Sequence, residues 1–134
     1  MFSELEFYVR YAETDAMGVV HHASYLVYME EARSHFARER GQSYADFEAS
    51  GYFLVVSEAE ARFIAPARYG DKVKIRIEVE EFKSRRITFS YKIYETGKNT
   101  LLVEARTRHI CINKEGQLSV IPETWREVWS EKSD

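Results

Sequence analysis

The residues best suited to chemistry lie in one short segment, residues 12–23, which carries acidic residues, a glycine and two adjacent histidines. Asp15 precedes His22 by seven residues, and Gly18 lies between them. A helix is expected to begin near Ser24, and the first backbone N–H groups of a helix lack intrahelical partners and carry a partial positive charge. A carboxylate and such donors, converging on one carbonyl group, can drive acyl transfer: the donors hold the oxyanion, and the carboxylate activates water or attacks directly.

The same residues also have a simpler structural interpretation. Asp15 follows Thr14, and an aspartate in this setting commonly caps a turn by accepting a nearby backbone N–H. The imidazole of His22 could orient Asp15 or a substrate, or it could be an ordinary hydrogen-bonded histidine. The residues alone therefore leave a catalytic loop and a structural turn both open.

The histidines and the single cysteine give no pattern typical of a metal site. His109 and Cys111 are two residues apart, which places them on the same face of a strand, and no third residue has the spacing of a zinc ligand. We therefore expect no metal site. One cysteine excludes an intramolecular disulfide and fits a reducing compartment.

Length and composition indicate one globular domain over residues 1–134. The chain has 45% hydrophobic and 31% charged residues, and its net charge of -3 gives no general attraction to nucleic acid or to an anionic membrane. No apolar run reaches the ~18–20 residues that span a bilayer, and residues 1–6 do not resemble a signal peptide. We expect a cytoplasmic protein with no transmembrane segment and no nucleic-acid partner.

Hydrophobic periodicity predicts the elements that must position the loop. Apolar residues recur every three or four positions from Ser24 to Arg40, which predicts a long helix. Glu30 and Arg33 are expected on its solvated or interfacial face, where they could pair. A short helix follows over 43–49, and another is expected over 122–130. Alternating or β-branched runs predict strands over 2–11, 52–64, 72–82, 86–95 and 100–112.

The order of these elements predicts an α+β fold. The first strand carries Phe2, Leu5, Phe7 and Val9 in a pattern close to period two, which indicates one buried face. In residues 72–79, charged side chains alternate with apolar ones, so the sheet is expected to have one wet face and one buried face. An antiparallel sheet of five or six strands, wrapped around one long central helix, buries both the helix stripe and the apolar sheet face.

Two segments of the chain resemble a known family. The run Tyr11–Leu26, YAETDAMGVVHHASYL, followed by Met29–Arg33, MEEAR, resembles the signature of the 4-hydroxybenzoyl-CoA thioesterase family. Within it, the run is similar to the small bacterial acyl-CoA thioesterases associated with the Tol-Pal system. The run Pro66–Asp71, PARYGD, matches a second hallmark. Relatives commonly carry Asn where this chain has Ser24, an equivalent residue for a helix start. The resemblance implies a hotdog fold and hydrolysis of acyl-coenzyme A without a cofactor.

The resemblance also implies roles for individual residues. Asp15 matches the catalytic carboxylate, as general base or nucleophile, and His22 matches the residue whose backbone N–H binds the thioester carbonyl. Gly18, Val19 and Tyr25 are expected to line the substrate site. The phosphates of coenzyme A are expected on a turn, often in a partner subunit, that carries Lys83, Arg85 and Arg86; this turn could equally be a solvated hairpin tip.

The expected assembly is a homodimer or homotetramer, because a sheet wrapped on one helix leaves an open edge. An alternative function is a non-catalytic module that binds acyl-CoA or acyl carrier protein in the same groove. The presence of Asp15 favours hydrolysis. The sequence does not predict the length of the acyl group.

Overall fold

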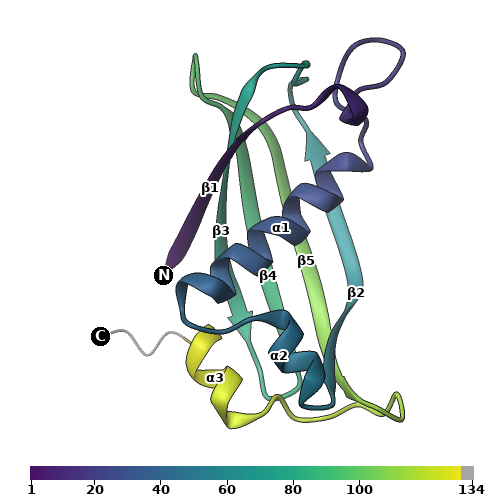
Figure 1. Ribbon diagram of the computed structural model, residues 1–134, viewed down its shortest axis with the longest axis vertical. Coiled ribbons are helices and arrows are strands. Elements are labelled where there is room, and N and C mark those ends of the chain that lie inside the picture. Colours follow the sequence, from purple (N-terminus) through teal and green to yellow (C-terminus); the bar gives the residue numbers. More distant parts are fainter. Residues whose placement is uncertain (131–134) are drawn as a thin grey trace.

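A five-stranded antiparallel sheet is the framework of the protein in a computed structural model that describes residues 1–130 (Figure 1). Its strands lie in the order β1-β3-β4-β5-β2, and every neighbouring pair is antiparallel. Their bounds are β1 Phe2–Tyr8, β2 Tyr52–Phe63, β3 Lys72–Phe82, β4 Arg86–Glu95 and β5 Thr100–Asn113. The predicted domain ends at residue 134; residues 131–134 lie outside the described part of the chain.

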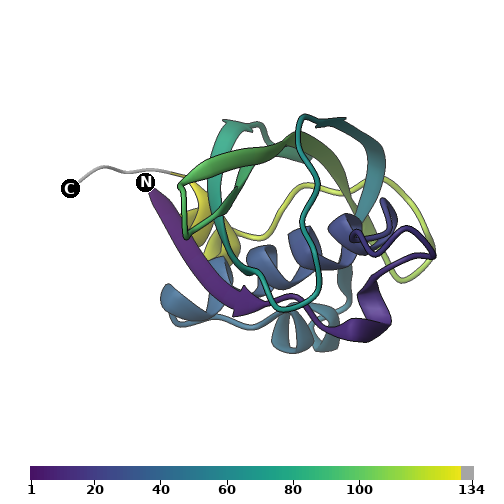
Figure 2. The same cartoon turned by 90° about the horizontal axis from the view of Figure 1, so that it is seen from above.

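Three α-helices pack against one side of this sheet. The longest, α1 (Ser24–Glu39), lies against the side toward which the strands curve, and α2 (Tyr44–Ala49) and α3 (Glu123–Trp129) lie near its C-terminal end (Figures 1 and 2). A 3-10 turn, η1 (Tyr11–Glu13), follows β1. The α+β class is confirmed. Within residues 1–130, no helix combines the length and apolar character needed to cross a membrane.

The core forms where the apolar stripe of α1 meets the inner face of the sheet. Tyr28, Met29 and Phe36 of α1 are at most 2% exposed, and Val73 and Ile75 of β3 are fully buried. A second set of aromatic side chains joins the two short helices: the rings of Phe47 and Trp125 lie 4.5 Å apart, and those of Trp125 and Trp129 lie 4.7 Å apart. The apolar residues that recur every three or four positions in the sequence are thus the ones that pack in the core, which is why their spacing predicts the helices.

The first strand corrects two predictions. It ends at Tyr8 rather than at residue 11, because Val9 donates its N–H to the carbonyl of Asp71 and the chain then enters η1. Phe2 is 46% exposed and lies under the guanidinium of Arg76, 3.5 Å from its ring centroid, whereas Ser3 is the buried neighbour. Phe2 is therefore out of phase with the inward residues of β1.

Arg33 corrects the prediction for the exposed face of α1. The residue is only 9% exposed, and its Nη1 donates to the hydroxyl of Tyr91 at 3.0 Å instead of pairing with Glu30. That hydroxyl also bonds Thr107 at 2.6 Å, and Thr107 bonds Nε2 of His109 at 2.8 Å. Position 33 lies four residues after Met29 and three before Phe36, which places it on the buried stripe.

The outer face of the sheet carries charged side chains, paired across strands. Arg108 bonds Glu58 at 3.1 Å, Arg106 bonds Glu60 at 2.8 Å, and Arg62 lies 3.7 Å from Glu104; each pair is directly opposite in the β2–β5 register. That register shifts between Val56 and Glu58, and similar shifts occur between Val79 and Glu81 and between Ile93 and Tyr94. An extra residue of this kind bends a strand, which lets the sheet follow α1.

Candidate active site

The loop between η1 and α1 is pinned against the segment after β2. Bridges join Thr14 to Val20 and Val19 to Arg68, and Val20 donates its N–H to the carbonyl of Ala67 at 2.9 Å. The two stretches that carry the sequence resemblance therefore lie side by side. The loop is held at the end of the sheet where β3 begins, because the N–H of Val9 bonds Asp71 (Figure 1).

Asp15 is half-buried and fixed by the turn that it begins. Its Oδ1 accepts the N–H of Met17 at 2.8 Å and that of Val19 at 3.4 Å, and its own N–H bonds the Val19 carbonyl at 2.8 Å. Gly18 closes the turn with φ +78, a conformation that favours glycine. Within residues 1–130, Oδ2 has no hydrogen-bond donor. Asp15 thus caps a turn, and one of its oxygens stays free.

In the segment that leads into α1, one backbone N–H is free and the N–H groups on both sides of it are hydrogen-bonded. His21 donates its N–H to the Glu13 carbonyl at 2.8 Å, Ala23 donates to Nδ1 of His21 at 3.1 Å, and Ser24 donates to the His21 carbonyl at 2.9 Å. In the described chain the N–H of His22 has no acceptor. His22 is exposed, and its ring stacks on that of His21 with centroids 4.2 Å apart. A single unpaired donor therefore stands at the positive end of α1.

Glu13 is a site residue for which the sequence analysis gave no role. Its Oε1 accepts the Tyr28 hydroxyl at 2.7 Å and the N–H of Arg10 at 2.9 Å, and its Oε2 accepts the Arg10 side chain at 2.5 Å. Burial raises the pKa of Glu13, but these hydrogen bonds outweigh it and hold the pKa below its usual value. The spacing of Arg10 and Glu13, three residues apart before a helix, was the available signal.

Three predicted substrate residues lie in or beneath this loop. Gly18 and Val19 belong to the Asp15 turn, and Tyr25 is 3% exposed, with its ring 5.6 Å from that of Phe63. Burial is the main cause that raises the pKa of Tyr25. Tyr25 therefore supports the loop from the core side, and its contact with substrate stays a prediction.

The predicted phosphate-binding residues are not brought to Asp15 within one chain. Lys83, Arg85 and Arg86 lie at the turn between β3 and β4, at the far end of β3 from the loop (Figure 1). Eleven residues of strand separate the two ends, roughly 30 Å. All three side chains are exposed, and Lys83 lies 3.8 Å from Glu81.

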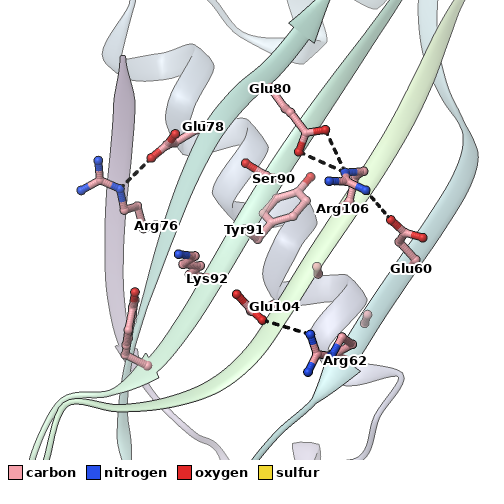
Figure 3. Close-up of a pocket in the computed structure, with 13 residues that line it drawn as sticks. Glu60, Arg62, Arg76, Glu78, Glu80, Ser90, Tyr91, Lys92, Glu104 and Arg106 are labelled. Carbon is pink, nitrogen blue, oxygen red and sulfur yellow. Dashed lines mark hydrogen bonds and ion pairs between the residues drawn. The ribbon is translucent and has the colours of Figure 1, made fainter.

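A hollow of about 980 Å³ on the outer face of the sheet is separate from this loop (Figure 3). Its lining includes Arg106, which bonds Glu80 at 2.9 Å and Glu60 at 2.8 Å, and Arg76, which bonds Glu78 at 2.9 Å. Neither Asp15 nor His22 lines it. Because most of its charges are compensated within the face, we interpret the hollow as a solvated surface.

Within residues 1–130, neither a metal cluster nor the cysteine offers an alternative catalytic centre. Among residues 1–130, no set of three or more His, Cys, Asp or Glu side chains is arranged to hold a metal ion. Cys111 is fully buried, and burial raises the pKa of its thiol to about 11, so the reactive thiolate is scarce at neutral pH. The loop of Asp15 and His22 is thus the candidate site.

A curved antiparallel sheet over a long helix defines the hotdog class of folds (Figure 2). Comparison with known proteins agrees: residues 9–128 match the model of the Thioesterase-like superfamily. The chain belongs to this family. The predicted class, a thioester hydrolase with a hotdog fold, is therefore confirmed.

Individual relatives are similar over most of the chain. The acyl-CoA thioester hydrolase YbgC of Escherichia coli O6:H1 is 34% identical over 105 residues, 78% of each chain. The crystal structure of hypothetical protein TT1821 from Thermus thermophilus is 42% identical, with a TM-score of 0.90 over 96% of this chain and 97% of that one. A DHNA-CoA thioesterase from Staphylococcus aureus is 31% identical, with a TM-score of 0.90 over 97% and 89%.

Proposed function

We propose that this protein hydrolyses acyl-coenzyme A to a carboxylic acid and free coenzyme A at the loop of Asp15 and His22. The observation that carries the proposal is the free N–H of His22, with paired amides on both sides, on the same loop as a carboxylate with one unoccupied oxygen. The names of the relatives, an acyl-CoA thioester hydrolase and a DHNA-CoA thioesterase, support this substrate class.

In the proposed mechanism, the thioester carbonyl accepts the N–H of His22 and lies at the positive end of α1. A water oxygen bonds to the carbonyl carbon while its proton passes to Asp15. The tetrahedral intermediate then expels the sulfur of coenzyme A, which takes up that proton. Alternatively, Asp15 itself attacks the carbon, and water hydrolyses the resulting mixed anhydride. Both routes release one acid and one thiol.

The proposed reaction uses only groups of the chain, and the absence of a cofactor remains a prediction. Full activity after dialysis against EDTA would support it, whereas loss of activity restored by a divalent metal would contradict it. The placement among the Tol-Pal associated thioesterases and the cytoplasmic location also remain predictions.

The complete site is proposed to need two subunits. Lys83, Arg85 and Arg86 lie far from Asp15 in one chain, so the coenzyme A phosphates would be held by the turn of a partner. In residues 1–130 no strand pairs with the outer edge of β2, which is twelve residues long and exposes Val56 and Phe63 by more than half. We propose that two such edges meet in a homodimer, which could pair further into a tetramer. A monomer in light scattering that still hydrolyses thioesters would contradict this.

The test of the function is release of free thiol from short, long and aromatic acyl-CoAs and from an acyl-loaded carrier protein. Hydrolysis of at least one substrate, lost in Asp15→Asn, supports the proposal. The alternative, a binding module for acyl-CoA or acyl carrier protein, would give a saturable complex without thiol release.

A further inference from the structure

The N–H of His22 is the free donor of this segment because the N–H groups of His21 and Ala23, on either side of it, already have acceptors. The N–H of His21 is held by the carbonyl of Glu13, and the N–H of Ala23 is held by the imidazole of His21. The side chain of Ser24 also donates to the Glu13 carbonyl, at 3.4 Å. We infer that Glu13 is a positioning residue, which fixes the start of α1 so that the His22 N–H alone faces the substrate. This inference rests on the proposed function.

The two ends of Glu13 act on different elements. Its carbonyl holds the loop at His21, and its carboxylate holds the hydroxyl of Tyr28, one turn into α1, at 2.7 Å. The Tyr28 side chain cannot follow a shifted loop, because it is 2% exposed and its ring lies 4.6 Å from Phe7 and 5.6 Å from Tyr25. Arg10 adds three donors to the same carboxylate.

This arrangement makes the loop and the first turn of α1 one rigid unit. Asp15 follows Glu13 by two residues. The bridge between Thr14 and Val20 joins the two strands of the loop, so a shift at Glu13 would move both of them. Catalytic geometry is sensitive to such alignment, because a displacement of about 1 Å in a site can lower the rate ~100-fold. The nucleotide of the substrate would be bound far from this loop, at the turn of a partner that carries Lys83, Arg85 and Arg86. Loss of the hydrogen bond between Glu13 and Tyr28 should therefore lower kcat and leave KM nearly constant.

An ordinary structural hydrogen bond makes a different prediction. It would change the melting temperature and leave the turnover of the folded enzyme unaffected. The chain offers a matched control in Tyr91, which is also 2% exposed and also hydrogen-bonded through its hydroxyl, to Arg33 and Thr107. Tyr28→Phe and Tyr91→Phe each remove one buried hydroxyl and keep the ring.

The test compares these variants with Glu13→Ala and Glu13→Gln in steady-state hydrolysis of acyl-CoA. We expect Tyr28→Phe to lower kcat about 10-fold with KM within about twofold, and Glu13→Ala to lower it about 100-fold. Glu13→Gln should fall between wild type and Glu13→Ala, because an amide oxygen still accepts from Tyr28 and from the Arg10 N–H. Tyr91→Phe should lower the melting temperature and keep kcat within about twofold. A Tyr28→Phe enzyme with the kcat of Tyr91→Phe would overturn the inference.

A second measurement does not depend on turnover. Amide NMR spectra of Tyr28→Phe should show shifts and faster hydrogen exchange at residues 13–24, with the sheet amides unchanged. Unchanged amides in this segment would overturn the inference. A wild-type enzyme that hydrolyses no thioester would remove the proposed function, yet the spectra would still decide whether Glu13 orders the loop.

Discussion

Replacement of the Asp15 carboxylate by an amide separates its structural role from its chemical role. Oδ1 accepts the N–H groups of Met17 and Val19, and the amide oxygen of Asn can accept both. Only the charge is lost from these bonds, which reduces their contribution by about 1 kcal/mol, or a few degrees of melting temperature for a chain of this size. The turn should therefore remain folded in Asp15→Asn.

The chemical role should not survive the same change. The amide places an NH₂ group where the free Oδ2 lies, and this group can neither take a proton from water nor attack the carbonyl. We expect kcat to fall at least ~100-fold, the lower limit for loss of a general base. The assay is release of free thiol from acyl-CoA at neutral pH, with mass spectrometry to exclude deamidation of the introduced amide back to aspartate.

Asp46→Asn is the control, because Asp46 is an exposed aspartate in the first turn of α2 and makes the same change of charge outside the loop. It should keep full activity. If Asp15→Asn retained more than about a tenth of the wild-type kcat, well above the range expected for a lost base, the catalytic assignment would be wrong. If instead it lost activity together with its fold, shown by circular dichroism, the argument about the turn would fail.

Three further outcomes follow from particular residues. Burial, followed by the Arg33 cation, lowers the pKa of His109 to about 3, so between pH 6.5 and pH 3 the unfolded chain binds a proton that the folded chain does not. The free energy of unfolding, measured with denaturant, should therefore fall from pH 6.5 toward pH 3 by up to about 1.4 kcal/mol per pH unit. His109→Gln should flatten this slope. Gly18→Ala meets no atom within 4 Å but keeps φ +78, so it should lose about 1 kcal/mol of stability and also activity, whereas Gly41→Ala, at φ +82, should lose only the stability. Cys111 should not react with a thiol reagent in the native protein and should react fully in guanidinium; rapid native labelling would contradict its burial.

Sequence periodicity was sufficient for most of the fold. The predicted strands over 72–82 and 86–95 have the observed bounds, because each is a long alternating run closed by turn residues. The helix from Ser24 ends one residue before the predicted Arg40. The pattern was misleading where a group had a partner distant in sequence, as Phe2 has in Arg76, Arg33 in Tyr91, and the N–H of Val9 in Asp71.

The candidate site was only partly predictable for the same physical reason. The sequence placed Asp15 and His22 on one loop before a helix, and the local turn of Asp15 follows from its neighbours. Which amide remains free depends on contacts of Glu13 with His21 and Tyr28, the latter fifteen residues away. Such contacts form only when the loop folds back on the helix, and no periodicity encodes them.

The extra residue in β2 limits how this lineage can change its length. Ser57 is the residue skipped between Val56 and Glu58. Deleting Ser57 would leave Glu58 opposite Arg108 and remove only the bend, whereas deleting the paired Ala59 would move Glu60 opposite the buried Thr107 and away from Arg106. Gains and losses of residues in β2 should therefore be confined to Ser57 and to the ends of the strand.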